Sequence, residues 1–300
     1  MCSLDKEEQM FFQTACYTDQ GPVRASNQDA YTVKTVQSGR REITLAAICD
    51  GMGGLAQGEV ASARMVRGVE AWFRQAAPAI LAEELPEGDL AAQWTELVQS
   101  ANQAIFRYGQ TQGVRLGTTV TALLLTGGRD YLLHVGDCRA YRITASDVLQ
   151  LTEDETLAAQ ELRSGRITEE EYLQDSRKNI LLQCVGAGGV VAPTLLAEPQ
   201  KEECVFLLCS DGFYHTLEVG ELAALYPLRT DRERMRQHLA ELGRLCRERG
   251  EQDNLTALAV ACCDSSCRPT LLLGEEDDVP RFLLDETVVH APEDGGPDLP

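Results

Sequence analysis

The sequence predicts an α+β fold in which two antiparallel β-sheets form a β-sandwich and pairs of α-helices cover the outer faces. Short apolar runs typical of strands come in consecutive blocks, with turn residues between them. Two long stretches with helical spacing follow the first block together, and a further amphipathic stretch precedes the last strand. This order differs from the regular strand–helix alternation that would indicate a parallel sheet.

The first half of the chain supplies most of the expected strands. Strand-compatible runs predict strands over 11–18, 30–36, 43–48, 120–125, 131–135 and 140–143. Two helices lie between the third and fourth strands; the first begins at about Leu55, and Asp89 is the expected N-cap of the second. Their apolar faces are formed by Val60, Met65, Val66, Val69, Trp72, Phe73 and Ala76, and by Leu90, Trp94, Leu97, Val98, Ala101 and Ile105.

The second half predicts a charged excursion, more strands and one long helix. Residues 152–176 are rich in charge and are expected to form helical structure that faces solvent. A short apolar helix is expected over 179–185. The domain is completed by strands over 190–197, 204–209 and 255–261 and by a helix with Met235, Leu239, Leu242 and Cys246 on its apolar face.

The chain is expected to form one domain over 10–263, with an extension over 1–9 and an acidic tail over 264–300. The tail holds ten acidic residues against two arginines, so it contributes −8 of the formal net charge of −20. Its composition and its lack of periodicity predict a disordered or weakly docked segment. Its apolar and acidic segment 282–289 is expected to stay solvated, to act as a docking peptide, or to be phosphorylated at Thr287.

The composition excludes several classes of protein. A net charge of −20 disfavours nucleic-acid binding and is compatible with cation binding. The first nine residues lack an apolar signal-peptide core, and the longest uncharged run, 179–197, would make a poor membrane span. Most of the eleven cysteines lie in apolar segments, and the Cys262, Cys263 and Cys267 spacing is only weakly zinc-like. We expect a cytoplasmic protein that binds no membrane.

Five aspartates stand at strand ends, several beside glycine: Asp29, Asp50, Asp137, Asp211 and Asp253. Each one alone also fits an ordinary turn. Carboxylates that share a site repel each other unless a cation lies between them, and ligation by oxygen alone favours Mg²⁺ or Mn²⁺ over Zn²⁺. The four histidines include no close pair, which also disfavours a zinc hydrolase.

Arg24 is the candidate phosphate ligand near these carboxylates. It lies in the polar loop 23–29, and a guanidinium can hold two phosphate oxygens at once. Two cations that shared Asp50 would lower the pKa of a bridging water, which could then attack phosphorus in line. As the alternative, Arg24 is an ordinary surface charge.

Six short motifs together resemble a known family. They are Val23-Arg24-Ala25-Ser26-Asn27-Gln28-Asp29, Asp50-Gly51-Met52-Gly53-Gly54, Gly117-Thr118-Thr119, Gly136-Asp137-Cys138-Arg139-Ala140-Tyr141, Ser210-Asp211-Gly212 and Asp253-Asn254-Leu255-Thr256. Each motif alone is weak, but their order over about 10–263 resembles the protein phosphatase 2C family of metal-dependent Ser/Thr phosphatases, most closely its bacterial branch. The resemblance implies that 10–263 is the catalytic domain.

The resemblance also implies a set of ligands for two core Mn²⁺ or Mg²⁺ ions. Asp50 would bridge the two ions, and the carbonyl oxygen of Gly51 would bind the first. Asp211 and Asp253 would bind the second ion, and Asn254 would order the turn that carries Asp253. The three aspartates, with Arg24, make up the implied catalytic centre.

Three further roles follow from the same resemblance. Asp29 would act through a coordinated water, Asp137 would help to hold a third ion, and Arg24 would bind the substrate phosphate. Residues 152–176 match the family's flap, a segment beside the site that influences substrate choice. As structural alternatives, Asp29 is a turn residue and Asp137 caps a hairpin turn.

The chain departs from the family pattern at a few positions. Met52 stands where animal members carry a histidine, so no side chain is an obvious general acid. Many bacterial flaps begin with Thr-x-Asp-His-Ser, whereas this flap begins Thr152-Glu153-Asp154-Glu155-Thr156, which puts its substrate contacts in doubt. Cys138 replaces a usual serine, beside an intact Asp137.

The activity that the resemblance implies is hydrolysis of phosphoserine and phosphothreonine in proteins by a hydroxide that bridges two metal ions. The implied partners are phosphorylated proteins and a cognate Ser/Thr kinase with its targets, and the implied state is a monomer. The alternative is a catalytically weak or inactive phosphoprotein-binding module of the same fold. The presence of Asp50, Asp211 and Asp253 argues against that alternative.

Overall fold

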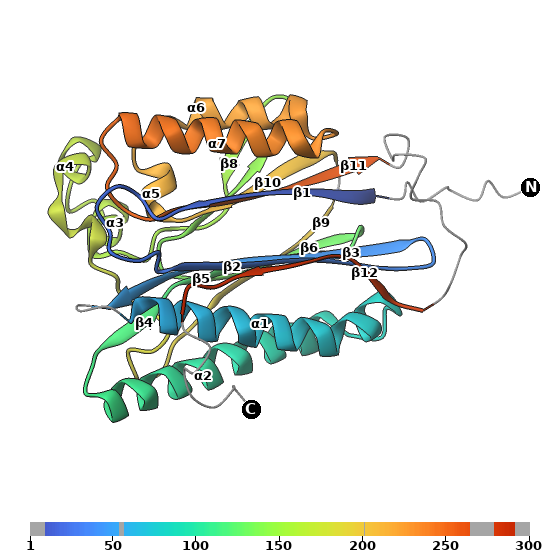
Figure 1. Ribbon diagram of the computed structural model, residues 1–300, viewed down its shortest axis with the longest axis horizontal. Coiled ribbons are helices and arrows are strands. Elements are labelled where there is room, and N and C mark those ends of the chain that lie inside the picture. The colour runs from blue at the N-terminus through green and yellow to red at the C-terminus, as the bar shows by residue number, and fades with distance from the viewer. Residues whose placement is uncertain (1–9, 54–56, 201, 265–278, 292–300) are drawn as a thin grey trace, which may run out of the picture.

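The predicted fold class is confirmed. A computed structural model describes residues 10–53, 57–200, 202–264 and 279–291. Two antiparallel sheets pack face to face, and helices cover the outer face of each sheet (Figure 1). The layers are therefore helix, sheet, sheet and helix, as the blocks of strands and helices in the sequence predict.

The first sheet has five strands in the order β1-β11-β10-β7-β8. Their bounds are Met10–Asp19 (β1), Leu255–Asp264 (β11), Cys204–Cys209 (β10), Arg139–Ile143 (β7) and Val148–Gln150 (β8). The second sheet has the order β12-β2-β3-β5-β6-β9, with β4 paired to β3. Its strands are Arg281–Val288 (β12), Asp29–Ser38 (β2), Arg41–Gly53 (β3), Val120–Leu125 (β5), Arg129–Val135 (β6), Thr194–Pro199 (β9) and Leu116–Thr118 (β4).

The longer helices lie on the outer faces of the two sheets. Helices α1 (Gly58–Leu81) and α2 (Glu87–Gln112) cover the second sheet, and α7 (Arg232–Glu248) covers the first (Figure 1). The shorter helices are α3 (Leu157–Arg163), α4 (Glu169–Gln174), η1 (Ser176–Asn179), α5 (Asp211–Tyr214), α6 (Val219–Leu222) and η2 (Ala223–Leu228). None of the helices in the described residues is both long and apolar enough to cross a membrane.

Strand β3 shows why the second sheet is buried on both faces. Leu45 and Ala47 pack against α1 and α2, whereas Ala46 and Ile48 pack into the core between the sheets. Alternate side chains of a strand point to opposite faces, so a continuous apolar run such as 43–48 fits a strand that is covered on both sides. The strand continues past Asp50 to Gly53, where Gly51, Met52 and Gly53 pair with β4.

The sequence predictions were wrong at three places in the elements. The expected helix over 179–185 is absent from the described chain: only η1 forms, and Val185 then exchanges two backbone hydrogen bonds of 2.8 Å with Thr118. Pro86, not Asp89, is the N-cap of α2, so Asp89 lies in the first turn, where its charge still favours the helix. Strand β9 begins at Thr194, four residues later than expected.

The acidic tail is not disordered throughout. Residues 281–288 form β12, which pairs with β2 from Arg281 opposite Gln37 to Val288 opposite Tyr31. For this strand the expectation of disorder is therefore wrong and the alternative of a docked segment is what the structure shows, whereas 265–278 and 292–300 lie outside the described residues, as do 1–9. The remaining domain boundaries stay predictions.

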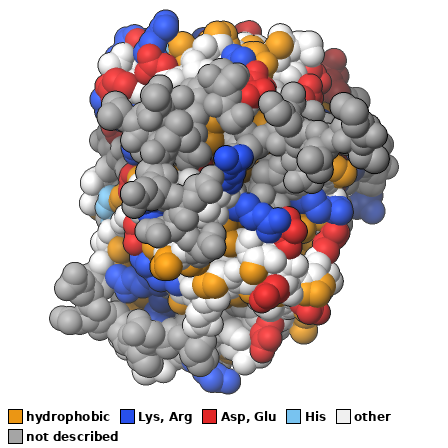
Figure 2. Space-filling model, turned by 90° about the vertical axis from the view of Figure 1, so that its right-hand side faces the viewer, with side chains coloured by type: hydrophobic (Ala, Val, Ile, Leu, Met, Phe, Trp, Pro, Cys, Tyr) orange, Lys and Arg blue, Asp and Glu red, His pale blue; other side chains and the backbone are white. Residues whose placement is uncertain are grey.

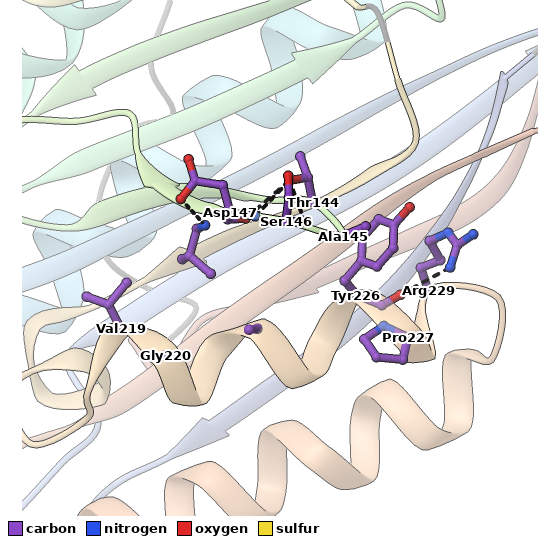
Figure 3. A pocket seen from close by; sticks show the side chains of 11 residues that line it. Thr144, Ala145, Ser146, Asp147, Val219, Gly220, Tyr226, Pro227 and Arg229 are labelled. Atoms are coloured by element: carbon purple, nitrogen blue, oxygen red, sulfur yellow. Dashed lines mark hydrogen bonds between the residues drawn. The ribbon is translucent and has the colours of Figure 1, made fainter.

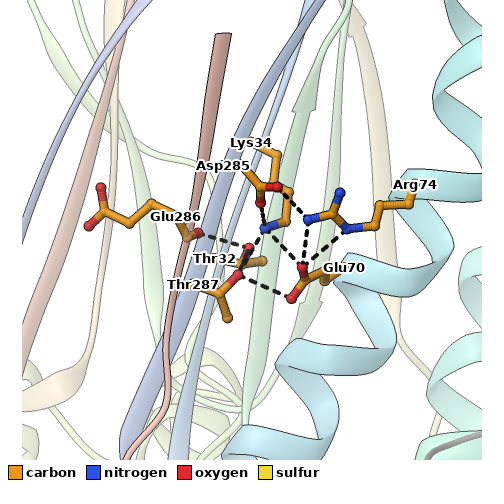
Figure 4. A network of polar contacts seen from close by, with 7 residues as sticks. All are labelled: Thr32, Lys34, Glu70, Arg74, Asp285, Glu286 and Thr287. Carbon is orange, nitrogen blue, oxygen red and sulfur yellow. Dashed lines mark hydrogen bonds and ion pairs between the residues drawn. The ribbon is translucent and has the colours of Figure 1, made fainter. Parts of the chain in front are cut away.

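A buried lysine explains why this strand docks (Figure 4). Lys34 is only 1% exposed, and a buried ammonium group is very costly without a partner. It forms ion pairs with Asp285 of β12 and with Glu70 of α1, the second at 3.1 Å. The hydroxyl of Thr287 accepts from Lys34 at 2.9 Å and donates to Glu70 at 3.1 Å. The acidic segment thus docks on its own chain, and phosphorylation of Thr287 stays a prediction.

Candidate metal and phosphate site

The five strand-end aspartates come to one end of the sandwich, the left end in Figure 1. Neighbouring antiparallel strands run in opposite directions, so the end of one lies beside the start of the next. Asp29 begins β2 and Asp50 lies near the end of β3, and these two residues are direct cross-strand partners. Asp137 follows β6, Asp211 begins α5 directly after β10, and Asp253 precedes β11.

Asp50 is held through its backbone, which leaves its carboxylate available. Its N–H donates to the Thr119 hydroxyl at 2.9 Å, and its carbonyl accepts from the Thr118 hydroxyl and the Thr119 N–H, both at 2.9 Å. Among the described residues, none donates a hydrogen bond to the Asp50 carboxylate. The Gly-Thr-Thr motif therefore fixes the position of this aspartate, a role that the sequence did not reveal.

Asp29 is a buried acid with an unpartnered oxygen. Its side chain is 2% exposed, Oδ2 accepts from the Ser210 hydroxyl at 2.9 Å, and Oδ1 has no hydrogen-bond partner in the described structure. Burial, together with the charges of Asp211 and Asp253, raises the pKa of Asp29 from 3.8 to about 7, against the lowering effect of the Ser210 hydrogen bond. An orphaned buried oxygen of this kind calls for a cation or a bound water.

The other carboxyl groups perturb one another in the same way. Burial raises the pKa of Asp50 well above its ordinary value, and the charges of Asp29 and Asp211 add to this. Burial also raises the pKa of Asp137, again with a contribution from Asp211. Such mutual shifts show that the carboxyl groups share one region of low dielectric, where their combined negative charge is unfavourable.

The donor set fits hard divalent cations. All of its members offer oxygen, which suits Mn²⁺ and Mg²⁺, and the orphaned Asp29 oxygen is free to accept from a bound water or to face a cation. No three Asp, Glu, His or Cys side chains of the described chain already enclose an ion-sized position. Carboxylates with raised pKa values repel one another, and a cation would reverse that repulsion. The residues therefore fit the predicted pair of core ions.

Arg24 lies at the rim of this region. Its guanidinium forms an ion pair with Asp253, and its side chain is 49% exposed. The predicted phosphate ligand and a predicted metal ligand are thus in direct contact, and the guanidinium is open to a ligand from solvent. This exposure suits a group that binds part of a large substrate.

Close backbone contact fixes the Gly51 carbonyl. A Cβ atom on Gly51 would lie 2.2 Å from the Gly58 carbonyl oxygen and 2.6 Å from that of Gln28. A Cβ atom on Gly58 would lie 2.5 Å from the Gly51 oxygen. Only glycine at both positions allows the end of β3 to meet the start of α1.

Asn254 joins the loop of Arg24 to the turn of Asp253, as the sequence predicts for an ordering role. Its Oδ1 accepts from the Gln28 N–H at 2.8 Å, while its Nδ2 donates to the carbonyls of Gln20 at 2.7 Å and Ser26 at 3.1 Å. The Asn254 side chain is nearly buried, at 4% exposed. One amide thus uses three hydrogen bonds to hold two loops together.

Replacing Asn254 with alanine should therefore loosen both loops. We expect the free energy of unfolding, measured with urea, to fall by about 2 kcal/mol, because the Gln28 N–H loses its partner in a nearly dry site. Calorimetry should show Mn²⁺ binding weakened at least several-fold. Gln252→Ala, which truncates an exposed neighbour, should change neither quantity. Equal effects of both substitutions would contradict the assigned role.

The turn that carries Asp137 is held by residues whose roles the sequence did not reveal. The Asp137 carbonyl accepts from the Tyr214 hydroxyl at 3.0 Å, and the guanidinium of Arg139 lies over the Tyr214 ring at 3.8 Å. Arg139 also donates two hydrogen bonds to Asp154 of the flap, at 2.8 and 2.7 Å. The first turn of α5 therefore connects the Asp137 turn to the flap.

The other surfaces contrast with this site. Figure 2 shows the opposite end of the molecule, where, outside the undescribed residues, basic side chains lie among acidic ones. A hollow of about 750 Å³ lies between the β7–β8 turn and the α6–η2 segment (Figure 3). Among the described residues that line it, Asp147 is the single acid, so it offers no second carboxylate cluster.

Comparisons with known proteins place the similarity over the same region. A family model described as Protein phosphatase 2C matches residues 23–259. The serine/threonine protein phosphatase PstP of Mycobacterium tuberculosis is 36% identical over 200 residues, 66% of this chain and 35% of PstP. The serine/threonine phosphatase stp of Listeria innocua is 30% identical over 247 residues, 81% of this chain and 93% of that protein.

A solved structure shares the fold. The catalytic domain of PstP in complex with two manganese ions has a TM-score of 0.67 and 30% identity, and the match covers 85% of this chain and 100% of that one. In sequence, the match spans only about a third of full-length PstP. Strand β12 lies beyond the range of the family model. Because that range is well over half of the chain and contains all six motifs, this chain belongs to the protein phosphatase 2C family.

Proposed function

We propose that this chain is a metal-dependent protein serine/threonine phosphatase that uses two Mn²⁺ or Mg²⁺ ions. The observation that carries the proposal is the convergence of five carboxyl groups, of which Asp29, Asp50, Asp137 and Asp211 have a raised pKa, beside an exposed arginine. Membership of the family and the relatives' names support the same reaction. When bound, the ions supply positive charge and a water acidic enough to act as a nucleophile near neutral pH.

The chain's own residues have separate tasks in this proposal. Asp50 with the Gly51 carbonyl, and Asp211 with Asp253, hold the two core ions. Arg24 binds and orients the substrate phosphate at the rim. Because Asp50 is fixed by Thr118 and Thr119 and Asp253 by Asn254, the ligands need little rearrangement, which favours catalysis.

Asp29 and Asp137 have supporting roles in the proposal. Asp29 is the cross-strand partner of Asp50, and its unpartnered oxygen would accept a hydrogen bond from a water bound with the ions. Asp137 helps to hold a third, weaker ion at the turn beside the flap. Substrate proteins, a cognate kinase, a cytoplasmic location, a role in signalling and a monomeric state remain predictions.

The test is phosphate release from a phosphothreonine peptide by the purified chain with Mn²⁺, with Mg²⁺ and with EDTA. We expect release that requires a metal ion and is lost in Asp211→Asn. A folded protein that releases no phosphate with either ion would overturn the proposal. The alternative, a phosphoprotein-binding module, would then be tested by binding of the same peptide.

A further inference from the structure

Glu155 is a flap residue with an unusual number of partners in separate parts of the chain. Its Oε2 accepts from the Gly136 N–H at 2.8 Å and from the Gln183 side-chain amide at 2.8 Å. Its Oε1 accepts from the Thr194 hydroxyl at 3.5 Å. One carboxylate therefore contacts the turn before Asp137, the chain that returns from the flap, and the start of β9.

The Glu155 backbone also bonds to the turn before Asp137 and to the chain that returns from the flap. Its N–H donates to the Gly136 carbonyl at 2.8 Å, and its carbonyl accepts from the Leu182 N–H at 2.7 Å. Both backbone groups of Gly136 are thus paired with this one residue. Gly136 has a φ of +107°, and a Cβ atom there would lie 2.6 Å from Thr119, so the turn has little freedom to adjust.

The neighbouring flap carboxylate makes a parallel connection. Asp154 receives two hydrogen bonds from Arg139, which stacks on Tyr214, and the Tyr214 hydroxyl holds the Asp137 carbonyl. The consecutive flap residues Asp154 and Glu155 therefore bind both ends of the Asp137 turn. Glu155 bonds to Gly136, and Asp154 bonds to Arg139. Charge-assisted hydrogen bonds of this kind are stronger than neutral ones.

The donors around position 155 favour a carboxylate there. Three donors converge on this side chain, and an ionised carboxylate has acceptor sites for all of them. A neutral imidazole has a single acceptor nitrogen, so the histidine that the sequence pattern leads one to expect here could not make these contacts. With Glu155 in place of the histidine of that pattern, the flap gains hydrogen bonds to the Asp137 turn that a histidine could not make.

We propose that Glu155 is a positioning residue that locks the flap to the Asp137 turn and so sets how a protein substrate reaches the site. The inference rests on the proposed phosphatase function. A loosened flap would still admit a small phosphate ester, but it would no longer present a fixed surface to a peptide. Misplacement of a positioning segment costs rate chiefly for the substrate that uses it.

The test compares Glu155→Ala with Glu153→Ala, which removes a neighbouring flap carboxylate that is 76% exposed and forms an ion pair with Arg163 of the same flap. Amide hydrogen exchange should become faster at Gly136 and Leu182 in Glu155→Ala alone. The kcat/KM ratio for a phosphothreonine peptide over p-nitrophenyl phosphate should fall about 10-fold in that variant. Glu155→Gln keeps an acceptor for the Gly136 N–H and should remain folded. Its kcat/KM ratio should lie between those of the wild type and Glu155→Ala.

The two arms separate this inference from the proposed function. A wild-type chain without activity would refute the phosphatase proposal, whereas the exchange measurement would still decide whether Glu155 locks the flap. Unchanged exchange at Gly136 and Leu182 in both alanine and glutamine variants would overturn the lock. An equal loss of kcat/KM on both substrates would overturn its effect on protein substrates.

Discussion

Replacing Asp50 with asparagine is expected to lower the rate of phosphate release by about 10³-fold, or roughly 4 kcal/mol of transition-state stabilisation. Asparagine keeps the shape of the side chain and its backbone contacts to Thr118 and Thr119, so the site stays in place. What it loses is the charge of the carboxylate proposed to bind both core ions. A neutral amide oxygen is a much weaker ligand for Mn²⁺.

The same substitution should stabilise the chain when no metal is present. Burial and the charges of Asp29 and Asp211 raise the pKa of Asp50 in the folded state. When the pKa of a group is higher in the folded state than in the unfolded state, stability falls as the pH rises above the unfolded-state pKa. Asparagine does not ionise, so the variant does not lose this stability. In EDTA at pH 7.5 we expect Asp50→Asn to unfold at a higher temperature than the wild type.

Added Mn²⁺ should reverse that order. A ligand that binds only the folded state stabilises it, by about 2.7 kcal/mol at one hundred times Kd, and the wild type should gain more than the variant. Thermal unfolding with EDTA and with Mn²⁺ checks both expectations, and Glu84→Gln removes an exposed charge as the control. A variant less stable than the wild type in EDTA would contradict the charge-repulsion account.

The carboxylates of this site could be predicted because each one carries a local signal. A buried strand followed by Asp-Gly, as at Asp50 and Asp211, combines an apolar run with a turn, and both patterns are short. Antiparallel pairing then brings such ends together, as the register of Asp29 opposite Asp50 shows. The family resemblance added the roles of these residues, which the strand pattern alone does not contain.

Contacts between distant residues could not be predicted in this way. Strand β12 has no fully buried residue and an acidic composition, and its main anchor, Lys34, lies about 250 residues earlier in the chain. Lys34 by itself resembles any charged residue of a half-exposed strand. The apolar run over 179–185 favoured a helix by composition, but Thr118 and Glu155 take up its backbone groups. Local patterns contain no information about such partners.

Asp29 is expected to give the metal-free protein an unusual dependence on pH. Burial, with the charges of Asp211 and Asp253, raises its folded pKa to about 7, against 3.8 for the ordinary group. Between these values the folded state holds a proton that the unfolded state has released, so stability falls as the pH rises from 4 to 7. The slope of about 1.4 kcal/mol per pH unit for one group amounts to at most about 4 kcal/mol in total.

The difference between the wild type and Asp29→Asn reports this contribution together with the relief of Asp50, whose pKa the Asp29 charge also raises. Urea unfolding in EDTA should show that the free energy of unfolding of the variant, relative to that of the wild type, increases from pH 4 to 7. It should show no further relative increase above pH 8. Saturating Mn²⁺ should abolish or reverse the trend, because metal binding requires ionised carboxylates. A difference that stays constant across this range would mean that Asp29 ionises normally, and its orphaned oxygen would then need another explanation.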